Sequence, residues 1–271
     1  MGHSLPGGLF SLPQTVASCP GACHGGPDQV GRAGHLHRWR EKCVSDMTSA
    51  PPKPRPGNRQ RIIEATVSLM NEQGGAVGTS QIAAHLRISP GNLYYHFRNR
   101  EEILRELFDA LSRDLDAVLH TRREETITAE RLAACYIGGT RVLWRYRFFF
   151  AAAMEFIVRD ESLSQKYQAL STRSKGFMRL IIQGAVKAAP GQCRLTAREC
   201  AHLAETMWVL WVSWPRYSEL SLPGQAIAEA DIGRGLEQIS LLLSPYLDAA
   251  FFRKTTRLLH RFVAELGPAA A

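Results

Sequence analysis

The 271-residue sequence contains no long uncharged hydrophobic run and few cysteines. Its most apolar stretch, MWVLWVSW at residues 207–214, is far shorter than the roughly 20 residues that a membrane-spanning helix needs. The N-terminus lacks the basic segment followed by an apolar segment that marks a secretory signal. Six cysteines in a chain of this length do not form a disulfide framework. We therefore expect a cytoplasmic protein without a membrane partner.

Motifs of the common enzyme classes are also missing. The sequence has no G-x-S-x-G, H-E-x-x-H, G-x-G-x-x-G or P-loop pattern. Cysteines and histidines cluster near the N-terminus, but their spacings match no common structural zinc site: Cys19, Cys23, His24, His35, His37 and Cys43. We therefore predict neither a metal nor a cofactor, and we expect that the protein is not an enzyme.

The chain divides into segments of different composition. Residues 1–58 are dominated by Gly, Pro, Ser and His without a sustained apolar period, so we predict a disordered extension. A chain that started at Met47 would begin with a short basic arm instead. From Arg59 onward nearly every segment has a helical apolar period. The expected fold is all-α, with a small N-terminal domain at 59–107, a larger helical domain at 108–263 and a disordered tail at 264–271.

Capping and breaking residues set the limits of the predicted helices. Thr79 or Ser80 can cap the second helix, and Ser89 and Asn99 are expected to cap the third and fourth. Pro245 is expected to break or kink the last predicted segment. The predicted helices lie near residues 59–73, 80–86, 90–97, 100–118, 129–144, 147–159, 163–189, 197–213 and 232–260.

The third predicted helix has one apolar side and one polar side. At 100° per residue, Leu93 and Phe97 fall together and anchor the helix to a core. A glycine, an amide, a phenol and an imidazole point the opposite way, and they belong to Gly91, Asn92, Tyr95 and His96, with Tyr94 on the flank. These groups suit base edges and phosphates in a major groove, and the net charge of +8 permits a polyanionic partner. The sequence therefore predicts a helix-turn-helix.

Arg100 lies in the first turn of the next predicted helix, where the positive end of the helix dipole repels a cation. A bound phosphate would relieve this repulsion by accepting hydrogen bonds from Arg100 and from the free backbone N–H groups of that turn. The alternative is that Arg100 pairs with Glu101 or faces solvent.

The stretch TSQIAAHLRISPGNLYYHFRNREEIL at 79–104 resembles the DNA-binding domain of the TetR family of bacterial transcriptional regulators, and the match covers about residues 59–107. The resemblance implies phosphate contacts from Thr79, Tyr94 and Arg100, and base or backbone contacts from Gly91, Asn92, Tyr95 and His96. We add Ser80, Gln81 and Ser89 to the predicted DNA-binding surface. The family commonly has Ala-Gly-Val in the turn where this chain has Leu86-Arg87-Ile88, and Lys at the position of Arg100.

The resemblance further implies a helical C-terminal domain that dimerises through its last two helices and often contains an effector pocket. The run WRYRFFF at 144–150 resembles a subgroup of repressors within the family. Aromatic residues are dense in this half of the chain, and they form either core and dimer contacts or the wall of an apolar cavity. The predicted effector-binding set is Trp144, Phe148, Trp208 and Trp211.

The resemblance therefore implies a homodimeric repressor that binds double-stranded operator DNA and releases it when a small apolar or amphipathic effector binds. One alternative is a regulator without a small ligand, controlled by a protein partner or by its abundance. The other is an enzyme with an accessory helix-turn-helix. An apolar pocket in the C-terminal domain would favour the ligand-responsive regulator over the ligandless one.

Overall fold

The structure, a computed structural model, describes residues 57–123, 125–221, 225 and 227–267. Several predictions fall outside this part of the chain. They are the disordered extension up to residue 56, the alternative start at Met47 and the cluster of Cys19, Cys23, His24, His35, His37 and Cys43. The predicted tail at 264–271 is partly wrong, because the last helix continues to Glu265.

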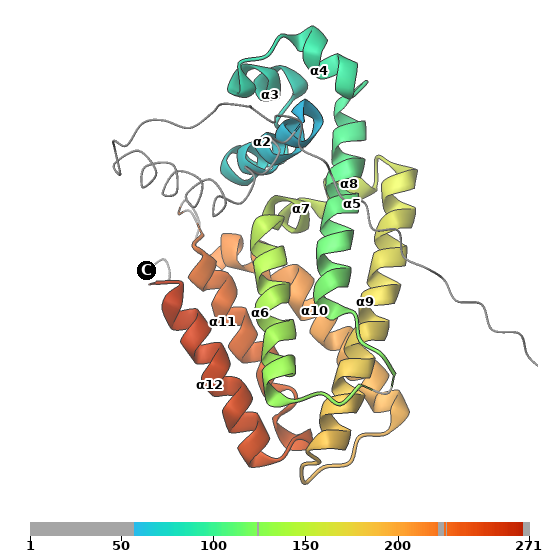
Figure 1. Cartoon of the computed structure of the whole chain (residues 1–271), viewed down its shortest axis with the longest axis vertical. Helices are drawn as coiled ribbons and strands as arrows, with labels where there is room; N and C mark the ends of the chain where they lie inside the picture. Colours follow the sequence, from blue (N-terminus) through green and yellow to red (C-terminus); the bar gives the residue numbers. More distant parts are fainter. Residues whose placement is uncertain (1–56, 124, 222–224, 226, 268–271) are drawn as a thin grey trace, which may run out of the picture. The chain divides into compact units, whose positions relative to one another are not determined.

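The described part of the chain is built from helices and contains no strand beyond an isolated bridge between Pro190 and Leu247, which confirms the all-α prediction (Figure 1). The N-terminal helices are α2 (Asn58–Gln73), α3 (Thr79–Leu86), α4 (Pro90–His96) and α5 (Arg100–Leu119). They are followed by α6 (Ala129–Arg145), α7 (Arg147–Ala151), α8 (Ala153–Ile157), α9 (Glu161–Ala188), α10 (Ala197–Ser221), α11 (Glu229–Leu241), the 3₁₀ turn η1 (Ser244–Tyr246) and α12 (Ala249–Glu265).

The predicted helices are confirmed with two main differences in their limits. The segment predicted at 147–159 forms two short helices, α7 and α8, separated at Ala152. The segment predicted to end at residue 213 continues through the buried Pro215 to Ser221. A proline inside a helix removes one backbone hydrogen bond. The Pro215 ring is buried, and the helix continues past it. Pro245 interrupts the last segment as predicted, because it lies in η1 between α11 and α12.

The helix caps of the N-terminal unit are confirmed for α4 and α5 but not for α3. The Ser89 Oγ accepts from the Asn92 backbone N–H at 3.2 Å, and the Asn99 Oδ1 accepts from the Glu102 N–H at 2.9 Å. The prediction of Thr79 or Ser80 as cap is wrong, because α3 begins at Thr79 itself. Gly78 precedes it, and its backbone N–H donates to the Gln81 side chain.

Helices α2, α3 and α4 form a small unit around a shared apolar core. Its fully buried side chains come from all three helices and include Ile62, Met70, Ile82, Leu93 and Phe97. The turn between α3 and α4 contains Arg87 at φ 55°, in the left-handed region that favours glycine. The turn therefore forms without the glycine that is common in the family.

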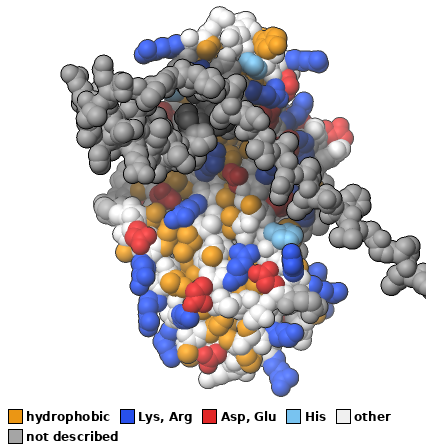
Figure 2. Space-filling view, viewed as in Figure 1, with side chains coloured by type: hydrophobic (Ala, Val, Ile, Leu, Met, Phe, Trp, Pro, Cys, Tyr) orange, Lys and Arg blue, Asp and Glu red, His pale blue; other side chains and the backbone are white. Residues whose placement is uncertain are grey.

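In the larger helical part, α6 packs against α5, α11 and α12, while α9 and α10 pack along each other. Helix α5 belongs to both parts, since it contacts α2 at one end and α6 and α9 further along (Figure 1). Among the described helices, none is both long and apolar enough to cross a membrane. The space-filling view shows Lys and Arg side chains around the end where α3 and α4 lie (Figure 2).

Candidate nucleic-acid interface

The two sides of α4 differ as the sequence predicts. Leu93 and Phe97 are buried, which confirms them as anchors. On the other side Tyr95 is 85% exposed and Asn92 is also exposed, so an amide and a phenol stand free of the protein surface. Helix α4 therefore presents a polar face that is held from behind by the apolar core.

Arg59 fixes helix α4 in place, although no motif in the sequence indicates this role. Its guanidinium donates to the backbone carbonyl of His96 at 2.6 Å and lies 4.2 Å from the centroid of the Phe97 ring. It also forms an ion pair with Glu106 of α5. A cation at the carboxyl end of a helix is favourable, because the last carbonyls lack partners within the helix. Arg59 thus joins α2, α4 and α5 at one point.

Thr79 and Tyr94 come together although they lie on different helices. The Thr79 Oγ1 and the Tyr94 Oη are 3.3 Å apart, and the Tyr94 side chain is half-exposed. Two hydroxyl groups this close can both donate to one anionic oxygen. The pair sits where the resemblance implies phosphate contacts.

The side chains of Gln81 and Ser89 are engaged within the protein. The Gln81 Oε1 accepts from the Gly78 N–H at 2.8 Å, and its amide nitrogen donates to Gln73 at 3.4 Å. Ser89 caps α4. Ser80 of α3 and Gly91 of α4 are exposed, and His96 at the end of α4 is half-buried.

Arg100 has different partners from those expected. Its Nε donates to the backbone carbonyl of Val77 at 2.8 Å, and a terminal nitrogen donates to the carbonyl of Gly75. The guanidinium also lies 5.7 Å from the Phe156 ring centroid. Carbonyl oxygens of the α2–α3 turn therefore supply the negative partner that the dipole argument assigned to a phosphate. The Arg100 side chain is partly exposed, and among the described residues it forms no ion pair with Glu101.

We expect Arg100→Ala to destabilise the fold by about 2 kcal/mol, because hydrogen bonds from a charged group contribute about 1.5–3 kcal/mol. The dependence of operator affinity on salt should stay unchanged. Thermal unfolding and binding at several salt concentrations measure both effects. The control is Arg98→Ala, an exposed arginine two residues earlier, which should change stability by less than about 0.5 kcal/mol. A fall in the salt slope of about 0.9 per subunit in Arg100→Ala, without loss of stability, would restore the phosphate role.

The four predicted effector-binding residues do not surround one cavity. Trp208 and Trp211 are buried neighbours with ring centroids 5.6 Å apart. The Arg147 guanidinium instead lies 3.9 Å from the centroid of the Trp144 ring, and the Phe148 ring packs against Phe156. Of the four, only Trp211 lines the apolar cavity of the C-terminal domain. Phe148 lines a different, larger pocket of about 1110 Å³, and Trp144 and Trp208 line neither of the two, so the four residues do not share one cavity.

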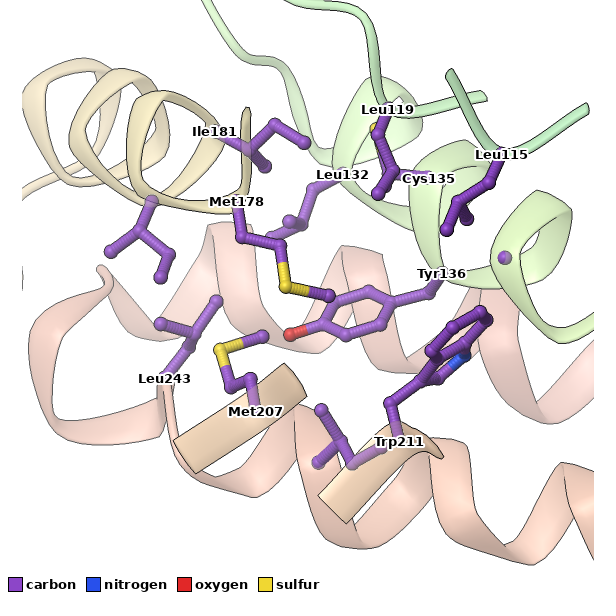
Figure 3. Close-up of a pocket in the computed structure, with 13 residues that line it drawn as sticks. Leu115, Leu119, Leu132, Cys135, Tyr136, Met178, Ile181, Met207, Trp211 and Leu243 are labelled. Carbon is purple, nitrogen blue, oxygen red and sulfur yellow. The ribbon is translucent and has the colours of Figure 1, made fainter. Parts of the chain in front are cut away.

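The apolar cavity lies between α5, α6, α9, α10 and α11 (Figure 3). Its volume is about 40 Å³, and it is lined by Leu115, Leu119, Leu132, Cys135, Tyr136, Gly139, Met178, Ile181, Ile182, Met207, Trp211, Ile239 and Leu243. Burial raises the pKa of the Cys135 thiol to about 11, so this sulfur is neutral and unsuited to metal binding near pH 7. No group of three or more His, Cys, Asp or Glu side chains in the described ranges could hold a metal ion.

Comparison with protein families gives two matches along the chain. The model described as "Bacterial regulatory proteins, tetR family" matches residues 62–107, the segment that contains α3 and α4. The model described as "Bacterial transcriptional repressor" matches residues 110–254, which include every residue that lines the cavity.

Solved structures of similar fold include several regulators of this kind. A TetR-family transcriptional regulator from Marinobacter aquaeolei VT8 is 26% identical with a TM-score of 0.68, and the match covers 76% of this chain and 99% of that one. The TetR family protein CprB from S. coelicolor A3(2) is 20% identical with a TM-score of 0.55, covering 76% and 96%. The fatty acid degradation regulator FadR from Bacillus halodurans is 19% identical with a TM-score of 0.51, covering 70% and 97%. The last two similarities concern the fold alone.

Proposed function

The chain belongs to the TetR family and is a DNA-binding transcriptional regulator, and we propose that it is a repressor that binds its operator as a homodimer and leaves it when a small apolar effector binds. The observation that carries the DNA-binding surface is the polar face of α4, which is exposed while Leu93 and Phe97 hold the helix to the core. The observation that supports the effector is the apolar cavity.

In this proposal α4 enters the major groove of the operator. Asn92 and Tyr95 contact base edges, because an amide offers both a donor and an acceptor and a phenol offers one hydroxyl. Thr79 and Tyr94 donate to a phosphate from their adjacent hydroxyls. Gly91 allows close approach of the DNA backbone, since its side of the helix carries no Cβ. His96 and Ser80 complete the surface at its edge.

A continuous set of aromatic contacts leads from the cavity toward the DNA-binding unit and supports an effector-responsive mechanism. Trp211, in the cavity wall, packs against Phe150 with ring centroids 5.5 Å apart. Phe149 lies 5.8 Å from both Phe150 and Phe156. The Phe156 ring faces Arg100, which holds the turn before α3. A ligand that displaces Trp211 would therefore press on the segment that positions α3.

A second connection runs through Asn71 at the end of α2. Its Nδ2 donates to the backbone carbonyl of Arg145 at 2.8 Å, and its Oδ1 accepts from the Phe148 N–H at 3.2 Å. One amide thus joins the end of α6 and the start of α7 to the DNA-binding unit. Because α6 also lines the cavity, a shift of α6 would act on α2 through these two hydrogen bonds. Both connections could carry a change at the cavity to the DNA-binding unit, as a ligand-responsive regulator requires.

Genomic fragments captured by the full-length protein are expected to share an inverted repeat. Its half-sites should be spaced by about 10–10.5 base pairs or a multiple, because two subunits place two α4 helices in successive major grooves. Sequencing of the captured DNA tests this spacing. Transcription of the genes next to the captured sites should rise when the gene for this protein is deleted. Capture without an enriched sequence would contradict the operator, and a fall in transcription would contradict the repressor role.

A further inference from the structure

The cavity contains one polar group whose hydrogen bonds are not made by the protein. Tyr136 projects from α6 across the space between Met178, Met207 and Trp211 (Figure 3). Its hydroxyl is buried, and among the described residues it has no hydrogen-bond partner. Burial raises the pKa of this phenol, so the hydroxyl is neutral and can both donate and accept. A buried hydroxyl without a partner costs free energy, and most native structures avoid it.

The rest of the lining cannot satisfy a water molecule in that place. A buried water is held by two to four polar partners, and besides Tyr136 the lining consists of aliphatic, thioether and thiol side chains, one indole and one glycine. None of the lining side chains is charged. A carboxylate or a phosphate would therefore lose its hydration without gaining a cation.

The size of the cavity limits the ligand as well. Its volume of about 40 Å³ is a few times the roughly 10–15 Å³ that one water requires. A cavity that binds benzene has a volume of about 150 Å³, so a one-ring ligand enters only if the flexible thioether side chains of Met178 and Met207 move aside. A long acyl chain would need the surrounding helices to separate.

We propose that Tyr136 determines the specificity of this cavity, and that the ligand is a compact neutral molecule with one hydrogen-bonding group for the Tyr136 hydroxyl. The inference rests on the proposed effector-responsive function and names the chemical class of its effector. The apolar remainder of the ligand fills the space between the two methionines and Trp211. The hydrogen bond to Tyr136 distinguishes it from a plain hydrocarbon of equal size.

Three probes of one ring each test this inference by calorimetric titration into the full-length protein. Phenol carries the hydrogen-bonding group, toluene has the same shape without it, and benzoate adds a charge. Phenol and toluene are expected to bind and benzoate is not. In Tyr136→Phe the ratio of phenol affinity to toluene affinity should fall about tenfold or more, because the hydroxyl partner is gone. Binding of toluene should stay unchanged or improve.

The control variant is Tyr146→Phe, which removes the hydroxyl of a buried tyrosine outside the cavity. That hydroxyl donates to the Asp114 carboxylate at 2.8 Å. Tyr146→Phe should therefore lower the melting temperature and leave the probe affinities unchanged. Tyr136→Phe should keep the melting temperature of the ligand-free protein or raise it, since the hydroxyl that it loses has no partner there. A lower melting temperature in Tyr136→Phe would show that the hydroxyl is paired, and would overturn the inference.

Two binding results would also overturn it. If neither neutral probe binds, the cavity does not take a compact ligand. If phenol keeps its advantage in Tyr136→Phe, this residue does not determine specificity. Operator binding, measured on the same samples, separates these failures from failure of the proposed function. If operator binding is intact and no probe binds, the inference fails while the DNA-binding role stands. If phenol binds without changing the operator affinity, only the proposed control by an effector is contradicted.

Discussion

Replacing Leu220 with aspartate is expected to produce monomers that bind the operator about 100- to 10,000-fold more weakly. A dimer that holds two half-sites at once binds with an affinity higher by that factor than a single subunit on one half-site. Helix α10 exposes three large apolar side chains on one stripe. Tyr217 is 59% exposed and Leu220 is 65% exposed. Val209, which is 53% exposed, lies about two turns before Tyr217. We propose that this stripe faces the second copy of the chain. An aspartate there would bury two like charges across a two-fold axis.

The family resemblance placed the dimer on the last two predicted helices, at 197–213 and 232–260, and the first of these corresponds to α10. The outer side of α12 is basic, with exposed side chains at Arg253, Arg257 and Arg261. A two-fold contact centred on that side would bring cations together, which is unfavourable without intervening anions. The proposed interface therefore lies along α10.

Light scattering gives the mass of Leu220→Asp, and titrations at several salt concentrations give its operator affinity. A monomer contacts half as many phosphates, so the slope of log affinity against log salt should fall to about half. Val158→Asp is the control, because Val158 is an exposed apolar residue after α8, away from the stripe. It should remain dimeric with wild-type affinity. A dimeric Leu220→Asp with normal affinity would place the interface elsewhere.

The sequence predicted the elements that depend on local order in the chain. The burial of Leu93 and Phe97 and the exposure of Tyr95 follow from the helical period alone. The caps at Ser89 and Asn99 follow from side chains that act on backbone groups three residues away. Neither depends on the rest of the fold.

The role of Arg100 could not be predicted in this way. Its carbonyl partners lie 23 and 25 residues earlier in the chain, and their position depends on how α2 and α3 pack against α5. The helix dipole depends only on the helix that contains Arg100. For the same reason no local pattern indicated the role of Arg59, whose partner Glu106 is 47 residues away.

The effector site was predicted from aromatic density, which says little about a cavity. Aromatic side chains fill space well, so they close gaps as often as they line them. Trp144 is covered by Arg147, and Trp208 is packed in the core. The cavity is lined mainly by aliphatic and methionine side chains from five helices. Only the packed arrangement of these helices locates Tyr136 inside it.

Removing the side chains on the polar face of α4 should weaken operator binding selectively. We expect Asn92→Ala and Tyr95→Ala each to cost about 1–3 kcal/mol against the best operator, or roughly 5- to 150-fold in affinity. The cost should be much smaller on unrelated DNA, because a base contact contributes little to nonspecific binding. Since Tyr95 is 85% exposed, its replacement should leave the thermal stability nearly unchanged.

Two further variants separate base contacts from phosphate contacts. Tyr94→Phe removes the hydroxyl that lies 3.3 Å from Thr79, and it should weaken binding to all DNA sequences by a similar factor. Ser68→Ala is the control, because it changes an exposed residue in the middle of α2. It should leave the affinity for the operator and for unrelated DNA unchanged. Titrations of each variant against the operator, against operators with single base-pair changes and against unrelated DNA measure these factors. Equal weakening of every sequence by Tyr95→Ala would rule out base recognition by this residue, because the loss of a base contact must alter the preference at the base pair that it touches.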